Sequence, residues 1–104
     1  KWIPVFKIEK YIKDFVWDFT KFRWEVWKTM WNPNLNSGDR QKLTEINSVM
    51  TQLQGVVIVA IQKSLSTKDN IEESYKQVNI YKSVLEDYKA TLEQINNKLW
   101  NTAK

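Results

Sequence analysis

Two carboxylates near the amino terminus are spaced as a metal site would require. Asp14 and Asp18 are four residues apart, so on a helix both side chains would point from one face and could bridge a divalent cation. Lys10 and Lys21 stand one turn away on either side, and lysines beside carboxylates are typical of an ordinary solvated helix face. We therefore predict an ordinary solvated helix face here and no metal ligand.

The side chains that most often carry out catalysis are missing. The 104 residues include no histidine and no cysteine, which removes the commonest general base, the thiolate nucleophile and the commonest transition-metal ligands. Gly38 and Gly55 stand alone and cannot form a phosphate-binding loop. The serines have no histidine partner that could activate them. The sequence thus predicts a protein that is not an enzyme, with no catalytic residue and no cofactor.

The most unusual feature of the sequence is its tryptophans. Four of the six lie within residues 17–31, at Trp17, Trp24, Trp27 and Trp31. Their spacing of seven, three and four residues places them on one side of a helix. Side chains of this size are typical either of a core or of a surface that binds another molecule. Whether these tryptophans form a core or a binding surface depends on the helices that surround them.

Apolar residues recur at steps of three and four along three segments, which is the spacing of amphipathic helices. The three series are Ile8, Ile12, Phe15, Phe19, Phe22, Val26, Met30; then Leu43, Ile46, Met50, Leu53, Val57, Ala60; then Val78, Tyr81, Leu85, Tyr88, Leu92, Ile95, Leu99. Short connectors between long helices force neighbouring helices to run antiparallel. We therefore predict an all-α single domain over residues 1–104, an elongated antiparallel three-helix bundle with helices at about 4–31, 38–64 and 68–102.

Turn-forming residues separate the three segments. Pro33 ends the first helix, because proline forces the residue before it out of the helical region. In the first connector, Asn36 or Ser37 is expected to cap the second helix. In the second connector, Ser66 or Thr67 is expected to cap the third.

The second segment contains the longest uninterrupted apolar run, residues 56–61. We expect a helix here that is apolar on most sides and is the best-buried element, although Gly55 weakens it by about 1 kcal/mol relative to alanine. A β-strand is the alternative for these six residues. The run is far shorter than the roughly 20 residues of a membrane-spanning helix, so we expect a soluble protein or one attached only at a surface.

The overall composition is typical of a soluble globular domain, at 42% hydrophobic and 27% charged residues. The chain begins with lysine, so we expect a processed protein or an excised domain, and the recurring charges in residues 1–20 do not resemble a signal peptide. Without cysteine, the cellular compartment cannot be inferred.

The net charge of +4 comes from 16 basic and 12 acidic residues. Acidic residues interrupt every basic cluster, whereas nucleic-acid binders carry a dense basic stripe. Nucleic acid is therefore disfavoured as a partner.

The tryptophans lie outside the apolar face of the first helix. They belong to a second seam, made of Phe6, Lys10, Lys13, Trp17, Thr20, Trp24, Trp27 and Trp31, whose centre is about 150° around the helix from the first seam. One interpretation is that the second seam packs on the other neighbouring helix. The other is that it faces outward, because the two neighbours of a helix in a triangular bundle are only about 60° apart.

An outward seam of indoles needs something to cover it, since soluble monomers rarely expose large apolar patches. Arg23 lies between the two seams, one turn from Phe19 and Trp27, where its guanidinium could rest on an aromatic ring. Tryptophan and arginine are enriched at the energetic centres of protein interfaces. We predict that the protein binds a protein partner, either a second copy or another chain, through Trp17, Trp24, Trp27, Trp31 and Arg23. The alternative is a protein that docks this helix on a membrane surface.

Overall fold

The computed structural model describes the backbone of residues 4–103 and the side chains of residues 4–101. The elements in chain order are α1 (Val5–Met30), α2 (Ser37–Leu53), a π-helical turn η1 (Gln54–Ile58), α3 (Val59–Thr67) and α4 (Ile71–Ala103). α2, η1 and α3 follow one another without a break and form one rod, called the middle rod below. The predicted all-α three-helix bundle is confirmed, and it measures 50 × 25 × 17 Å.

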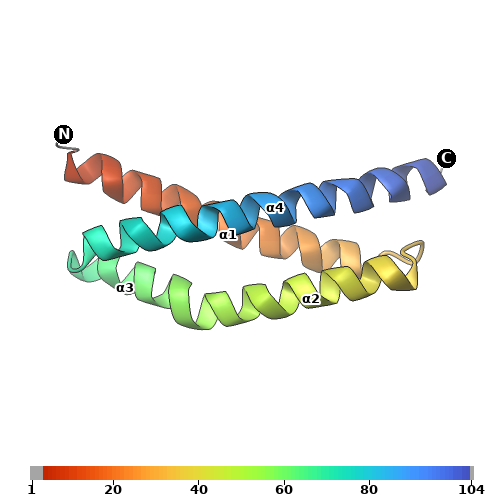
Figure 1. Ribbon diagram of the computed structural model, residues 1–104, viewed down its shortest axis with the longest axis horizontal. Helices are drawn as coiled ribbons and strands as arrows, with labels where there is room; N and C mark the ends of the chain where they lie inside the picture. Colours follow the sequence, from red (N-terminus) through yellow and green to blue (C-terminus); the bar gives the residue numbers. More distant parts are fainter. Residues whose placement is uncertain (1–3, 104) are drawn as a thin grey trace.

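The three rods are not simply parallel to one another. α1 and α4 run in the same direction and cross near their middles, and the middle rod runs antiparallel to both along one side (Figure 1). Because of the crossing, α2 lies mainly against α1, whereas α3 lies mainly against α4. The amino-terminal end of α1 and the carboxy-terminal end of α4 lie on the side away from the middle rod (Figure 1).

The core is formed by the predicted apolar faces of all three rods. In α1 the buried apolar residues are Ile12, Phe15, Phe19, Phe22 and Val26, and in α4 they include Val78, Leu85, Leu92 and Ile95. Burial of each such side chain contributes about 1.5–3 kcal/mol. The first and last members of the α1 series, Ile8 and Met30, are only partly buried, because the ends of α1 extend beyond the best-packed region.

The π-helical turn changes the face that the middle rod buries. It begins at the residue before Gly55, and such a turn adds one residue, which rotates everything after it by about 100°. The prediction that Ala60 lies in the core is therefore wrong, and Ile61 is buried instead. The apolar run is also not buried all round, since Val56 is 72% exposed. Residues 56–61 are helical, and no strand occurs in the described part of the chain.

The first connector forms as predicted. Asn36 is the N-cap of α2, and its side-chain oxygen accepts a hydrogen bond of 2.8 Å from the backbone N–H of Asp39. Arg40, in the first turn of the same helix, donates to the carbonyl oxygens of Met30 and Asn32 at the end of α1. Carbonyl groups at a helix end have no partner within the helix, so these bonds join α1 to α2.

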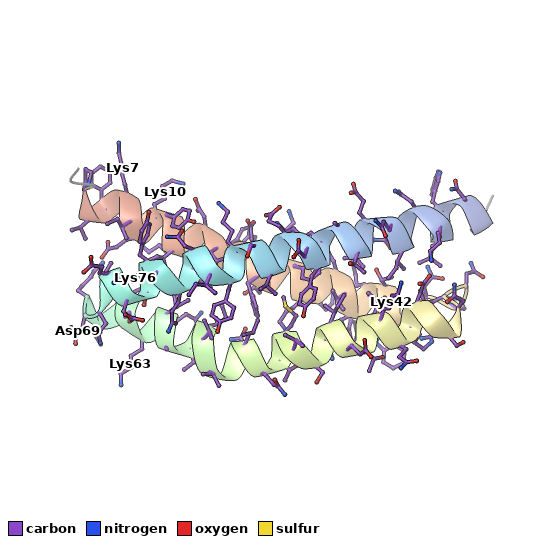
Figure 2. The ribbon with its side chains drawn as sticks, viewed as in Figure 1. Lys7, Lys10, Lys42, Lys63, Asp69 and Lys76 are labelled. Carbon is purple, nitrogen blue, oxygen red and sulfur yellow. The ribbon has the colours of Figure 1, made fainter. Side chains whose placement is uncertain are left out.

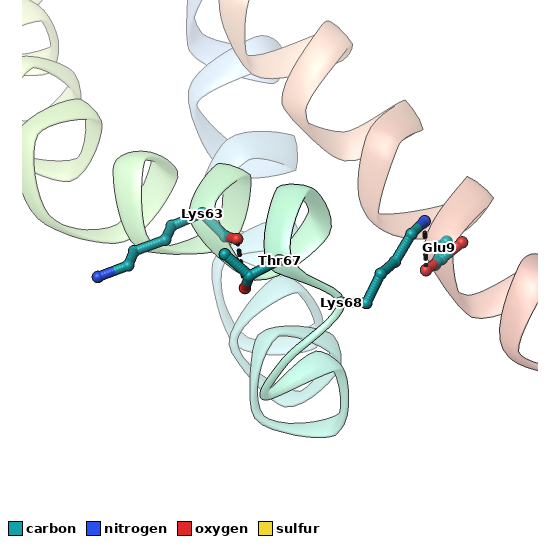
Figure 3. A network of polar contacts seen from close by, with 4 residues as sticks. All are labelled: Glu9, Lys63, Thr67 and Lys68. Atoms are coloured by element: carbon teal, nitrogen blue, oxygen red, sulfur yellow. Dashed lines mark hydrogen bonds and ion pairs between the residues drawn. The ribbon is translucent and has the colours of Figure 1, made fainter.

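The second connector differs from the prediction. Ser66 and Thr67 are not caps of the last helix; they form the last turn of α3, where the Thr67 hydroxyl donates to the carbonyl oxygen of Lys63 (Figure 3). The chain reverses through left-handed conformations at Lys68, with φ of 57°, and Asn70, with φ of 58°. The second helix therefore ends later than residue 64, and the third begins at residue 71 rather than 68.

Ion pairs join the helices at both ends of the bundle. At one end Lys68 Nζ lies 2.9 Å from Glu9 Oε2 of α1 (Figure 3). At the other end Lys98 Nζ of α4 lies 2.8 Å from Oδ2 of the buried Asp39. The hydrogen bond from Lys98 is the main cause that lowers the pKa of the Asp39 carboxyl below its ordinary value, and burial opposes this effect.

Candidate interaction surface

The four tryptophans predicted as binding residues lie on the outer face of α1. We call Trp17, Trp24, Trp27 and Trp31 the tryptophan ridge; their side chains are 67%, 57%, 47% and 69% exposed. Packing of the second seam on a neighbouring helix would have buried them, so that interpretation does not hold for the single chain. The ridge remains open because α2 and α4 both cover the opposite half of α1.

Three indoles of the ridge touch one another. The rings of Trp24 and Trp27 are stacked with centroids 5.3 Å apart and planes 19° apart, and Trp31 meets Trp27 edge-on at 6.0 Å. Such pairs are worth about 0.5–1.5 kcal/mol beyond the area that they bury. These ring contacts restrict the rotamers of the three side chains.

A groove lies between the ridge and the middle rod. It has a volume of about 360 Å³, and its walls are formed by Thr20, Arg23, Trp24, Trp27, Asn47 and Gln54. Trp27, the least exposed member of the ridge, forms part of the wall. Of the six lining residues only Arg23 is charged, and the other polar groups are amides and a hydroxyl. The groove thus combines aromatic faces with hydrogen-bond donors and acceptors.

Arg23 is the predicted site residue whose surroundings differ from expectation. Its guanidinium does not rest on an aromatic ring; Nη2 donates a 3.1 Å hydrogen bond to the Thr51 hydroxyl of α2. That hydroxyl in turn donates to the carbonyl oxygen of Asn47. Arg23 Nε is buried and forms no hydrogen bond with the described residues. A guanidinium has five N–H donors; with Nε buried and one Nη2 hydrogen bonded to Thr51, the two Nη1 hydrogens and the second Nη2 hydrogen have no partner among the described residues.

Lysines accompany the ridge: Lys13 continues its line, and Lys21 and Lys28 lie on the side away from the groove. Trp17 has Lys13 and Lys21 one turn away, and Lys21 and Lys28 lie one turn on either side of Trp24. We call Lys13, Lys21 and Lys28 the lysine strip. All three are exposed, and within residues 4–101 none of them forms an ion pair.

The carboxylates of α1 are engaged elsewhere. Asp14 pairs with Lys10 at 3.0 Å, and Asp18 lies 3.8 Å from Lys89 of α4. Glu25 is one turn from two members of the lysine strip, but it lines a groove on the α4 side together with Glu86 and Glu93. The described residues contain no cluster of three potential ligands that could hold a metal ion. The two aspartates that could have bridged a cation each lie beside a lysine.

Sequence reasoning missed two parts of this surface. The places of Lys21 and Lys28 beside the ridge, and of Asp18 and Glu25 nearer α4, follow from a spacing of 100° per residue, so the sequence does contain that signal. Composition along the whole helix, in which acidic and basic residues alternate, does not reveal it. The contribution of Asn47 and Gln54 depends on how α2 is aligned with α1, and no spacing within one helix indicates that alignment.

Comparison of the chain with protein-family models, with curated proteins and with solved structures finds no match. Among the described residues, no helix is both long enough and apolar enough to span a membrane. The functional inference therefore depends on the geometry and chemistry of the surface.

Proposed function

We propose that this protein is a non-catalytic helical bundle that binds a protein partner through the tryptophan ridge and Arg23. The observation that supports the proposal most strongly is the exposure of four tryptophans, between 47% and 69%, along one face of one helix. Their apolar surface gains free energy when a partner removes it from water, at about 25 cal/mol per Å².

The composition of the surface also supports a protein partner. Tryptophan and arginine, with tyrosine, are enriched among the residues whose truncation costs more than about 2 kcal/mol at protein interfaces. Here they stand together around a groove, with the amide side chains of Asn47 and Gln54 in its wall. Amides can hydrogen-bond both donors and acceptors of a polypeptide backbone. The arrangement is that of an apolar centre with polar groups at its edge, as in typical interfaces.

The experiment that tests the proposal compares three forms of the full chain as bait. The wild type, the double variant Trp24→Ala/Trp31→Ala and the control Trp100→Ala are immobilised, and bound proteins are quantified by mass spectrometry. Trp100 is 66% exposed but belongs to α4. Sedimentation over a concentration series measures self-association of the same three forms.

We expect binding of a protein, or of a second copy, to be lost in the double variant and kept in the control. Circular dichroism should show the same helicity in all three forms. Loss of helicity in the double variant would instead identify these tryptophans as residues that the fold requires. Binding that is equal in all three forms would refute the ridge as the interface.

A second candidate function is attachment to a membrane surface. The lysine strip beside exposed tryptophans favours it, because interfacial helices combine these residue types. Phosphatidylserine-containing vesicles would then shift the tryptophan emission of the wild type to shorter wavelength, and the double variant would respond less. No shift would exclude this function.

A further inference from the structure

We infer that the partner segment is an acidic amphipathic helix of another protein. This inference depends on the proposed function, because it names the kind of protein that covers the ridge. It is supported by how charge is distributed on both sides of the ridge, by the shape of the groove and by the symmetry that a dimer of this chain would need.

Both flanks of the ridge are basic. On one flank lie Lys21 and Lys28 of the lysine strip, and Lys13 continues the line of the ridge; these three ammonium groups have no carboxylate partner within residues 4–101. On the other flank lies the groove, where Arg23 is the single charged lining residue. A partner that presents carboxylates on both sides of an apolar stripe would be complementary to this surface, and such complementarity raises both the association rate and the specificity.

The middle rod supplies no carboxylate that could neutralise this surface. Its residues 37–67 contain only two, Asp39 and Glu45. Asp39 is buried and bonded to Lys98 of α4, and Glu45 lines a groove that it shares with Tyr88 of α4. Both therefore face α4, away from the ridge.

A second copy of the chain fits this surface poorly. In a two-fold symmetric dimer the surface meets itself. If the two α1 helices were antiparallel, the lysine strip of one copy would face the lysine strip of the other. If they were parallel, each strip would face the edge of the groove that holds Arg23. In neither orientation does the lysine strip meet a carboxylate of the ridge or of the groove lining, and like charges at an interface are unfavourable.

The groove also favours a helix over a lipid surface. Arg23 is held at the wall of the groove by its bond to Thr51, so a ligand group must enter the groove to reach its remaining donors. A side-chain carboxylate on a helix that lies beside Trp24 and Trp27 could do so, and a guanidinium binds a carboxylate through two parallel hydrogen bonds. A flat layer of headgroups would contact the outer edge of the indoles.

The length of the ridge sets the length of the partner segment. Trp17 and Trp31 are fourteen residues apart, which is about 21 Å along a helix. A partner helix of about four turns, or roughly 15 residues, would cover the ridge. Its apolar residues would recur at steps of three and four, as in other helices that bind in grooves.

The test is a selection from a displayed library of random peptides of about 15 residues against the full chain. Peptides that also bind Trp24→Ala/Trp31→Ala are removed. We expect the remaining peptides to carry net negative charge and an apolar stripe, and to bind the wild type at least about tenfold more tightly than the double variant.

Charge reversal then tests the basic flank directly. Lys21→Glu/Lys28→Glu should weaken binding of a selected peptide by about tenfold or more, and added salt should weaken binding to the wild type. The matched control is Lys63→Glu/Lys76→Glu, which changes the net charge equally; Lys63 projects from α3 away from the bundle (Figure 2). We expect the control to change the affinity by less than about twofold.

Several results would overturn the inference while leaving the proposed function intact. Selected peptides that require the ridge but are neutral or basic would do so, and so would equal effects of the two charge-reversed variants. A dimer in sedimentation that the double tryptophan variant abolishes would identify a second copy as the occupant. A selection that yields no ridge-dependent peptide, together with a vesicle-induced shift in tryptophan emission, would instead refute both the inference and the proposed protein-binding function.

Discussion

The two flanks of α1 differ in how their polar groups are paired. On the α4 flank the Tyr11 hydroxyl donates to Asn79 at 2.7 Å, the Thr29 hydroxyl donates to Asn96 at 3.3 Å, and Asp18 faces a lysine of α4. On the α2 flank Arg23 makes one such bond, to Thr51, and beside it stand exposed indoles. On the α4 flank these polar side chains of α1 thus have partners in α4, beside a groove at Glu25, whereas the α2 flank retains apolar surface and unpaired donors.

The largest difference in the free energy of unfolding should appear when one aromatic residue is removed from the core beside the α4 flank and another from the tryptophan ridge. Phe22, which is 2% exposed, lies in the core beside the α4 flank, and Phe22→Ala should lower the free energy of unfolding by about 3–5 kcal/mol. Trp24→Ala should lower it by no more than about 1.5 kcal/mol, the upper value for its stacked pair with Trp27. Urea titration followed by circular dichroism measures both. A large loss for Trp24→Ala would mean that the ridge belongs to the core.

Acid should weaken the connection between α2 and α4 through Asp39. The bond from Lys98 lowers the pKa of Asp39 in the folded chain below its unfolded value. The stabilisation is therefore present above the unfolded pKa of about 3.8 and is lost as the pH falls through the lower folded pKa. Urea titrations at a series of pH values should show a smaller acid-induced loss of stability in Asp39→Asn than in the wild type. Identical pH profiles would contradict this role.

Removing one side-chain hydrogen bond of the α4 flank should lower the free energy of unfolding by a smaller amount. Tyr11→Phe removes the donor to Asn79 and should lower the free energy of unfolding by about 0.5–1.5 kcal/mol. Tyr81→Phe is the matched control, because Tyr81 is also half-buried and its hydroxyl has no hydrogen bond to the described residues. Equal effects of the two substitutions, measured by thermal or urea unfolding, would show that the bond adds no stability.

Local rules predicted most of the fold. The steps of three and four identified the buried faces of α1 and α4, and the cap at Asn36 was correct because side-chain capping depends on neighbouring residues only. The errors lie where the helix geometry itself changes. The π-helical turn rotated the end of the middle rod, and the left-handed conformations of Lys68 and Asn70 moved the second connector; neither residue is a glycine, which would have indicated such a turn.

The candidate site was only partly predictable for a different reason. The exposure of the tryptophans could be predicted from the two apolar seams of α1, because one helix cannot pack two opposite faces on neighbours that lie close together. The hydrogen bond of Arg23 to Thr51 and the groove wall at Asn47 depend on the alignment of α1 with α2. That alignment results from packing between residues distant in the sequence.

The most direct test of the account is to observe the indole N–H signals of the six tryptophans by NMR while a selected acidic peptide is added to the ¹⁵N-labelled chain. The account predicts that the signals of Trp17, Trp24, Trp27 and Trp31 shift or broaden together and that the signal of Trp100 stays in place. Shifts centred on Trp100, or unchanged signals from the ridge at saturating peptide, would show that the outer face of α1 is not where a partner binds.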